Sequence, residues 1–112
     1  DTTLYGWKNT RSWIYVKDFC EAFYGLLYNS KSVGQIINIG SNDETPVIKL
    51  AEIIAKEMGI DPKTIIKKPA PEGSVNRRMP DIKKVTRLAK WKPRTNLRKG
   101  LAQTVKWYME EA

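Results

Sequence analysis

Residues 10–23 read TRSWIYVKDFCEAF, and within this stretch a strand pattern gives way to a helix pattern. Aromatic and β-branched side chains dominate residues 11–16, which predicts a β-strand. Asp18 and Glu21 form a capping-box pattern with the aspartate in the N-cap role, which predicts the start of a helix. Apolar residues at helical spacing then predict a helix over residues 19–28 with a buried face made of Phe19, Ala22, Phe23, Leu26 and Leu27.

A second strand and a second helix follow. Residues 35–39 (QIINI) form a short apolar run, which predicts a buried strand. Thr45 and Pro46 predict the start of the next helix, with the threonine as N-cap and the proline at the first helical position. Gly59 predicts a left-handed stop for that helix.

The chain after Gly59 predicts a turn, a short strand and a loop. Asp61-Pro62 is a turn signal, and residues 65–67 predict the short strand. Residues 69–80 contain three prolines and one glycine, which favours a loop. Taken together, alternating strands and helices predict an α/β fold, a small lobe of mixed helices and short strands.

Two helices close the chain. Asp81 predicts the cap of a short helix that ends at about Leu88, and Asn96 or Thr95 caps the last one. We assign the side chains of Trp91 and Trp107 to packing between elements.

Composition excludes several classes of protein. With 112 residues, 41% of them apolar, the chain predicts one domain with a modest core. No apolar run approaches the ~20 residues of a membrane span, and no signal segment is visible at the N-terminus. The single cysteine, Cys20, fits a reducing compartment, so we expect a cytoplasmic protein. Without histidine, neither the usual zinc sites nor Ser-His-Asp and Cys-His catalysis are available.

The net charge of +8 is concentrated in the second half of the chain. Residues 1–62 carry six basic and eight acidic side chains, whereas residues 63–112 carry fourteen basic and four acidic ones, which gives −2 and +10. A basic half predicts an anionic partner, and charge alone leaves phosphate, nucleic acid and an acidic surface open. Neither G-x-G-x-x-G nor G-x-x-x-x-G-K-[ST] occurs, so these residues hold no glycine-rich phosphate cradle.

Three arginines are candidates for binding a phosphate group. A guanidinium presents a planar fork of donors that matches the oxygens of a phosphate. Arg11 begins the first predicted strand, and Arg77 and Arg78 stand near the end of the proline-rich loop. Taken alone, each of them is more readily explained as a solvated surface charge, and the phosphate-binding interpretation stays open at this point.

The motifs, read in order, resemble a known family. TRSWIYVKDFCEAF, IINIG, the helix begun by Thr-Pro, RRMPDIKK and WKPRTNLRKGLAQTVKWY look like the C-terminal part of nucleotide-sugar epimerases, dehydratases and decarboxylases. These enzymes are extended short-chain dehydrogenases/reductases, and the likeness covers roughly residues 4–110. It implies that residues 1–112 form a single substrate-binding C-terminal domain of a Rossmann-type enzyme. It also implies that residues 35–39 join the edge of a Rossmann sheet contributed by an N-terminal half absent from this chain.

The resemblance further implies roles for individual residues. The arginines with which the family binds the diphosphate fall on Arg11 and Arg78, with Arg77 as the alternative one position away. Val47 matches a position that lines the nucleotide pocket, and it is equally a position for plain packing. The implied cofactor is NAD(P), bound in the intact enzyme by the N-terminal half and not by this chain. The implied partners are a nucleoside-diphosphate sugar, that half, and a second copy in a homodimer, with no membrane and no nucleic acid.

The family's Tyr-x-x-x-Lys pair does not occur in the sequence, because no tyrosine has a lysine four residues later. We therefore expect the chain to be a fragment or a separated C-terminal domain of such an enzyme, without redox activity of its own. The competing hypothesis is a stand-alone module that binds anions or RNA through its basic half. The sequence leaves open the base, the sugar, and whether the parent enzyme epimerises, dehydrates or decarboxylates.

Overall fold

The structure is a computed structural model that describes residues 2–111. The described helices are α1 (Val16–Leu27), α2 (Val47–Glu57), α3 (Lys83–Ala89) and α4 (Leu97–Glu111), with 3₁₀ turns at Ser30–Ser32 and Pro62–Thr64. The described strands are β1 (Thr2–Tyr5), β2 (Thr10–Ser12), β3 (Glu44–Pro46), β4 (Ile65–Lys68) and β5 (Arg77–Arg78). The α/β fold class predicted from the sequence is confirmed.

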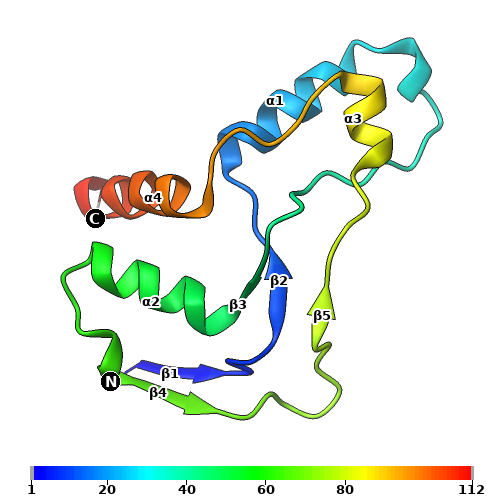
Figure 1. Cartoon of the computed structure of the whole chain (residues 1–112). Helices are drawn as coiled ribbons and strands as arrows, with labels where there is room; N and C mark the ends of the chain where they lie inside the picture. The colour runs from blue at the N-terminus through cyan, green and yellow to red at the C-terminus, as the bar shows by residue number, and fades with distance from the viewer. Residues whose placement is uncertain (1, 112) are drawn as a thin grey trace.

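The strands form two small sheets that share no strand. β1 pairs in parallel with β4, and β2 lies in the middle of the other sheet, antiparallel to β3 and parallel to β5. In Figure 1 the β1–β4 pair lies at the foot of the molecule, α2 lies beside α4, and α1 and α3 lie together at the opposite end. None of the helices in residues 2–111 combines the length and the hydrophobicity of a membrane span.

The core lies between α1 and α3. Ala22 and Leu26 of α1 contact Val85 of α3, and Ile82 and Trp91 complete the cluster. Burial of each large apolar side chain of this kind contributes about 1.5–3 kcal/mol, so the cluster fixes the two helices against each other. The packing role predicted for Trp91 is confirmed by its 5% exposure.

The predicted buried face of α1 is wrong for three of its five members. Ala22 and Leu26 are buried, but Phe19, Phe23 and Leu27 are exposed. The helix is amphipathic as the spacing indicates, yet α3 covers a narrow stripe of it and leaves the rest of its apolar surface uncovered. The packing role assigned to Trp107 is wrong, because its side chain is 57% exposed.

Three predicted helix caps are also wrong, and one of them is Asp81, because the N-cap of α3 is Ile82. The helix α1 begins at Val16 with Tyr15 as its N-cap, so Asp18 lies inside the first turn. Its carboxylate accepts hydrogen bonds from the backbone N–H groups of Arg94 and Thr95, far along the chain. Thr45 lies in β3 with its hydroxyl bonded to Asp43, and the N-cap of α2 is Pro46.

Other predicted boundaries are confirmed. Gly59 follows the C-cap of α2 with φ +72°, the left-handed conformation that glycine adopts without steric cost. The carboxylate of Asp61 caps the turn at Pro62–Thr64, and β4 forms where a short strand is predicted. The side chain of Asn96 accepts a hydrogen bond from the N–H of Lys99, as expected of the cap of α4.

Residues 35–39 do not form the predicted buried strand. No ladder pairs them with any other part of residues 2–111, and Ile36 is 88% exposed, although Ile37 and Ile39 pack against the core. Because a strand is defined by its ladder, an apolar run without a neighbouring strand stays irregular. The predicted first strand, at residues 11–16, is likewise shorter, since β2 ends at Ser12. The predicted loop at residues 69–80 contains β5.

Candidate functional site

The parallel pair β2–β5 brings together two of the three candidate arginines. Arg11 is the register partner of Arg78, and Thr10 is the register partner of Arg77. Register partners on neighbouring parallel strands present their side chains on the same face of a sheet, about 4.8 Å apart. Arg11 and Arg78 therefore share one face although 67 residues separate them in the sequence.

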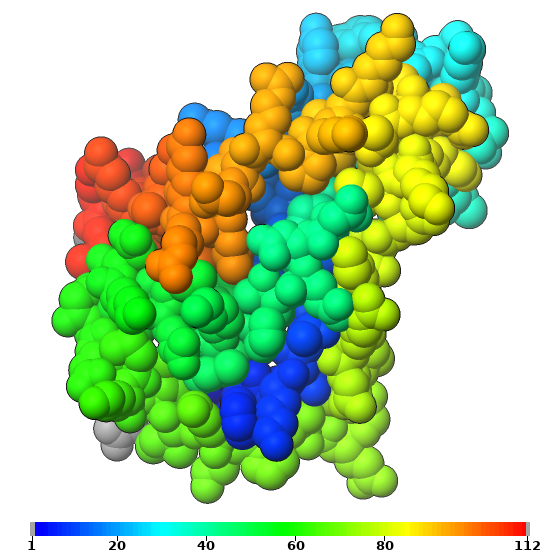
Figure 2. Space-filling view, in the orientation of Figure 1, coloured from blue at the N-terminus to red at the C-terminus, as the bar shows by residue number. Residues whose placement is uncertain are grey.

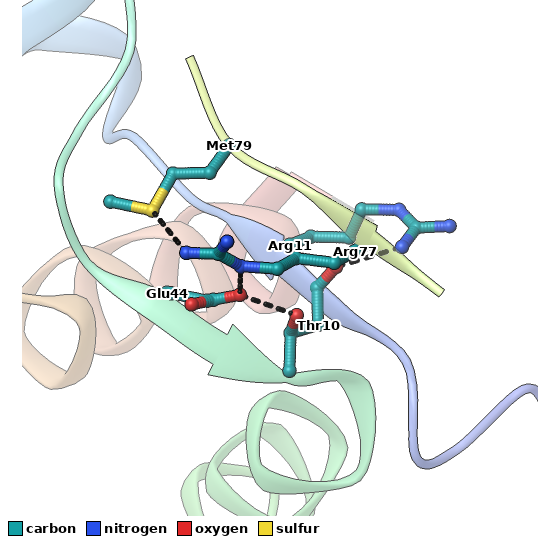
Figure 3. A network of polar contacts seen from close by, with 5 residues as sticks. All are labelled: Thr10, Arg11, Glu44, Arg77 and Met79. Carbon is teal, nitrogen blue, oxygen red and sulfur yellow. Dashed lines mark hydrogen bonds and ion pairs between the residues drawn. The ribbon is translucent and has the colours of Figure 1, made fainter. Parts of the chain in front are cut away.

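Arg77 occupies the other face, because successive residues of a strand point to opposite sides. Its Nε lies 2.5 Å from Oε2 of Glu44 in β3, and its Nη2 lies 3.8 Å from the sulfur of Met79. The same Glu44 oxygen accepts a hydrogen bond from the Thr10 hydroxyl at 2.8 Å. In Figure 3 the guanidinium of Arg77 points toward Glu44 while that of Arg11 extends the other way.

This network perturbs two ionisable groups. Hydrogen bonds from Arg77 and then from Thr10 lower the pKa of the Glu44 carboxyl below its ordinary value of 4.5. The reciprocal bond to Glu44 raises the pKa of the Arg77 guanidinium. Both groups stay charged at neutral pH, so Arg77 is held by a carboxylate.

The two arginines on the opposite face are held differently. Nη1 of Arg11 donates to the backbone carbonyl of Thr10 at 2.7 Å, and the residue is half-buried. Arg78 is exposed, and no carboxylate within residues 2–111 forms an ion pair with it. Their side chains start from the same face of the sheet, an arrangement suited to an anion with several oxygens.

Val47 begins α2 just beyond this sheet. Its backbone N–H donates to the carbonyl of Asn9 at 2.8 Å, and its side chain is half-buried. It follows Thr45, the register partner of Arg11, by two residues. The start of α2 is therefore bonded to the residue that directly precedes β2, the strand that carries Arg11.

Three cavities lie elsewhere on the molecule. One of about 630 Å³ separates residues 13–17 from α4 and is mostly apolar. Another, of about 410 Å³, is lined by polar and basic groups that include Lys92 and Arg94, and Trp13 lines both. A third, of about 440 Å³, is lined by Lys83, Lys84 and Arg87 among others. None of these three is lined by Arg11, Val47, Arg77 or Arg78.

The connections that follow β1 and β2 do not have the form of a dinucleotide-binding turn. In a dinucleotide site a strand leads through a glycine-rich turn directly into a helix whose N-terminus receives the pyrophosphate. β1 leads instead through Gly6 into β2, and β2 leads into α1 through Trp13, Ile14 and Tyr15. We therefore assign no contact with such a cofactor to these residues. No group of three or more His, Cys, Asp or Glu side chains within residues 2–111 is suited to a metal ion.

Known proteins are similar to this chain in both sequence and fold. The chain is 41% identical over 100 residues to a putative UDP-glucose 4-epimerase of Methanocaldococcus jannaschii, which covers 89% of this chain and 31% of that protein. It superposes on dTDP-glucose 4,6-dehydratase of Bacillus anthracis in complex with NAD, with a TM-score of 0.83 and 31% identity over 96% of this chain. For UDP-glucose 4-epimerase of Thermotoga maritima with UDP-glucose, the TM-score is 0.87 at 25% identity over 99% of this chain.

The chain spans about a third of these proteins, since it covers 34% and 35% of the two solved structures. The sequence profile described as GDP-mannose 4,6 dehydratase matches residues 1–104, nearly the whole chain. The chain thus belongs to the GDP-mannose 4,6-dehydratase family, within the extended short-chain dehydrogenases/reductases that include nucleotide-sugar epimerases and dehydratases.

Proposed function

We propose that this chain is the nucleotide-sugar-binding lobe of an NAD(P)-dependent sugar epimerase, dehydratase or decarboxylase, in which Arg11 and Arg78 hold the diphosphate. The observation that carries the proposal is the β2–β5 register, which puts these two guanidinium groups on one face of the sheet. A diphosphate offers several oxygens and about two negative charges, and two forked donors from different strands match it.

The role of these residues is binding and orientation. A diphosphate does not react in such a transformation, so energy gained from holding it positions the sugar at the reacting centre. NAD(P), when bound, supplies hydride transfer, and we place its site in a part of the enzyme other than this chain. The dehydratase relative, about three times as long as this chain, is in complex with NAD, which supports NAD(P) as the cofactor of the intact enzyme. Val47, at the start of α2, is proposed to line the nucleotide side of the same site.

Calorimetric titration of the full-length protein that carries this chain with UDP and with dTDP tests the proposal. Arg11→Ala and Arg78→Ala are each expected to weaken binding about tenfold or more, because each removes a charge-assisted contact. Uridine, which lacks the diphosphate, serves as the ligand control, and its binding should not respond to either substitution.

The matched protein control is Arg87→Ala, an exposed arginine that lines a different cavity. It should leave the affinity for UDP unchanged. Unaltered UDP binding in both Arg11→Ala and Arg78→Ala would contradict the proposal. Binding of RNA with a steep salt dependence and no response to Arg11→Ala would favour the stand-alone basic module instead.

A further inference from the structure

One carboxylate joins all three strands of the sheet that carries the arginine pair. Oε2 of Glu44, in β3, lies 2.5 Å from Nε of Arg77 in β5 and 2.8 Å from the hydroxyl of Thr10 in β2. This polar network lies on the face opposite Arg11 (Figure 3), and the register places Arg78 on the same face as Arg11. Glu44 is thus well placed to hold β5 against β2 without occupying the proposed ligand face.

The strand β5 has few other attachments. It consists of two residues, and residues 71–78 are all exposed. Figure 2 shows this stretch, in yellow-green, along the surface of the molecule. Within residues 2–111, two side-chain hydrogen bonds join residues 71–79 to the remainder, one between Asn9 and Ser74 at 3.4 Å and one between Arg77 and Glu44. The register of such a short, exposed strand is weakly specified by burial.

The register of β5 decides which of its two arginines, Arg77 or Arg78, lies opposite Arg11. A slip of β5 by one residue moves each side chain to the opposite face of the sheet. A slip that brings Arg77 opposite Arg11 keeps an arginine at that place, so hydrophobic patterning does not distinguish the two alignments, but it moves Asn76 into the place of Arg77 opposite Thr10. The side-chain contact that does distinguish them is the ion pair of Arg77 with Glu44.

We infer that Glu44 is a positioning residue that, through its ion pair with Arg77, fixes the register of β5 and so presents Arg78 beside Arg11. The inference rests on the proposed function of the arginine pair. It assigns different roles to the two adjacent arginines: Arg77 anchors the strand, and Arg78 binds the ligand. Glu44 acts through the backbone of β5 and makes no contact with the diphosphate.

The substitution Glu44→Gln, made in the full-length protein that carries this chain, distinguishes this role from the alternative in which Arg77 itself binds the diphosphate. Glutamine keeps the size of the side chain and removes its charge, so β5 loses its ionic anchor. UDP binding is expected to weaken about twofold to fivefold, the scale of an exposed ion pair. If Arg77 bound the diphosphate itself, loss of its carboxylate partner would leave binding unchanged or tighten it, and that outcome overturns the inference.

The matched control is Glu21→Gln. Glu21 forms the other ion pair at 2.5 Å, with Arg94, between α1 and the segment before α4. The same chemical change there should leave the affinity for UDP unaltered. Equal weakening by Glu21→Gln and Glu44→Gln would mean a general loss of stability and would contradict the positioning role.

The charge-reversed pair Glu44→Arg/Arg77→Glu supplies the rescue. It restores an ion pair across β3 and β5, and the Thr10 hydroxyl accepts a hydrogen bond from an arginine as readily as it donates one to a glutamate. Most of the lost affinity should return. A swapped variant that binds UDP as weakly as Glu44→Gln would count against the inference.

Amide hydrogen exchange gives a readout independent of any ligand. The N–H of Thr10 donates to the carbonyl of Asn76 at 2.9 Å, immediately before β5. Its exchange should accelerate in Glu44→Gln and slow again in the swapped pair, and unchanged exchange would refute the inference. If Arg11→Ala and Arg78→Ala leave UDP binding intact, the proposed function fails. If they weaken it and Glu44→Gln does not, the positioning role alone fails.

Discussion

The carboxylate of Asp18 accepts a hydrogen bond from the backbone N–H of Thr95 at 2.9 Å, which ties the first turn of α1 to the segment before α4. The N–H of Arg94 donates to the same oxygen at 3.2 Å, and the hydroxyl of Thr95 donates to the other at 3.3 Å. Asp18 is 4% exposed, so water does not readily replace it as the acceptor. This buried connection holds the last helix in place.

Replacement of Asp18 by alanine is expected to lower the free energy of unfolding by about 3 kcal/mol. It leaves two backbone N–H groups and one hydroxyl without their acceptor, and each unsatisfied buried group costs about 1–3 kcal/mol, reduced where water gains access. Urea unfolding measures the change. Asp81→Ala is the matched control, since its carboxylate accepts one exposed hydrogen bond, from the N–H of Lys83, and its loss should cost about 1 kcal/mol. Equal losses in the two variants would contradict this reading of Asp18.

Truncation of Val85 tests the core between α1 and α3. Val85 is completely buried, so Val85→Ala removes apolar contacts and leaves a cavity, at an expected cost of about 2 kcal/mol. Val33→Ala makes the same change at a side chain that is 79% exposed and should alter stability by less than about 0.5 kcal/mol. The difference between the midpoints of thermal unfolding of the two variants measures the effect. Similar midpoints would show that this cluster is not the main core.

The conservative substitution Arg78→Lys tests the geometry of the guanidinium group while the positive charge is kept. Lysine keeps the positive charge but lacks the planar fork, so it makes one point contact where arginine makes two parallel bonds. We expect UDP binding to weaken about fivefold to tenfold, less than in Arg78→Ala. Arg77→Lys should have a smaller effect, because that residue is proposed to hold Glu44. The opposite order of the two affinities would exchange the roles of the adjacent arginines.

The Glu44–Arg77 ion pair predicts a dependence of stability on pH. The pKa of Glu44 is lower in the folded protein than its ordinary value of 4.5 because Arg77 and Thr10 bond its charged form. A group whose pKa is depressed by folding contributes stability above its unfolded pKa and loses it as the pH falls through its folded pKa. The native protein should therefore be more stable than Glu44→Gln at neutral pH, and the difference should disappear as the pH falls below 4.5. Urea unfolding at neutral and acidic pH measures this difference, and one that grows on acidification would contradict the assignment.

Local patterns in the sequence were sufficient for the elements that depend on them. The helix α2 and the cap at Asn96 follow from spacing and side-chain chemistry within a few residues. The strand β1 carries no comparable signal, because its partner β4 begins at Ile65, more than sixty residues away. Residues 35–39 have the composition of a strand, yet within residues 2–111 they have no ladder to join.

The candidate site was also predictable only in the features that depend on local sequence. Arginines near a predicted strand and at the end of a loop are visible as residue types, and the resemblance pointed to Arg11 and Arg78 over Arg77. Which of the two neighbours faces Arg11 depends on the pairing of β2 with β5, a relation between distant segments that periodicity does not encode. The sequence did not identify Glu44 as part of the site for the same reason, since its partners Thr10 and Arg77 lie 34 and 33 residues away.

The presence of two adjacent arginines, Arg77 and Arg78, determines how an insertion or deletion in the chain would affect the site. Ile82 is anchored in the core, so the distance along the chain from Ile82 back to β5 determines which residue lies opposite Arg11. Deletion of Met79 would move Arg77 into the place of Arg78, and a guanidinium would still stand there. Asn76 would then take the place of Arg77 and could not form an ion pair with Glu44. The site thereby tolerates a change in chain length that would erase a single arginine, at the expense of a less firmly held strand.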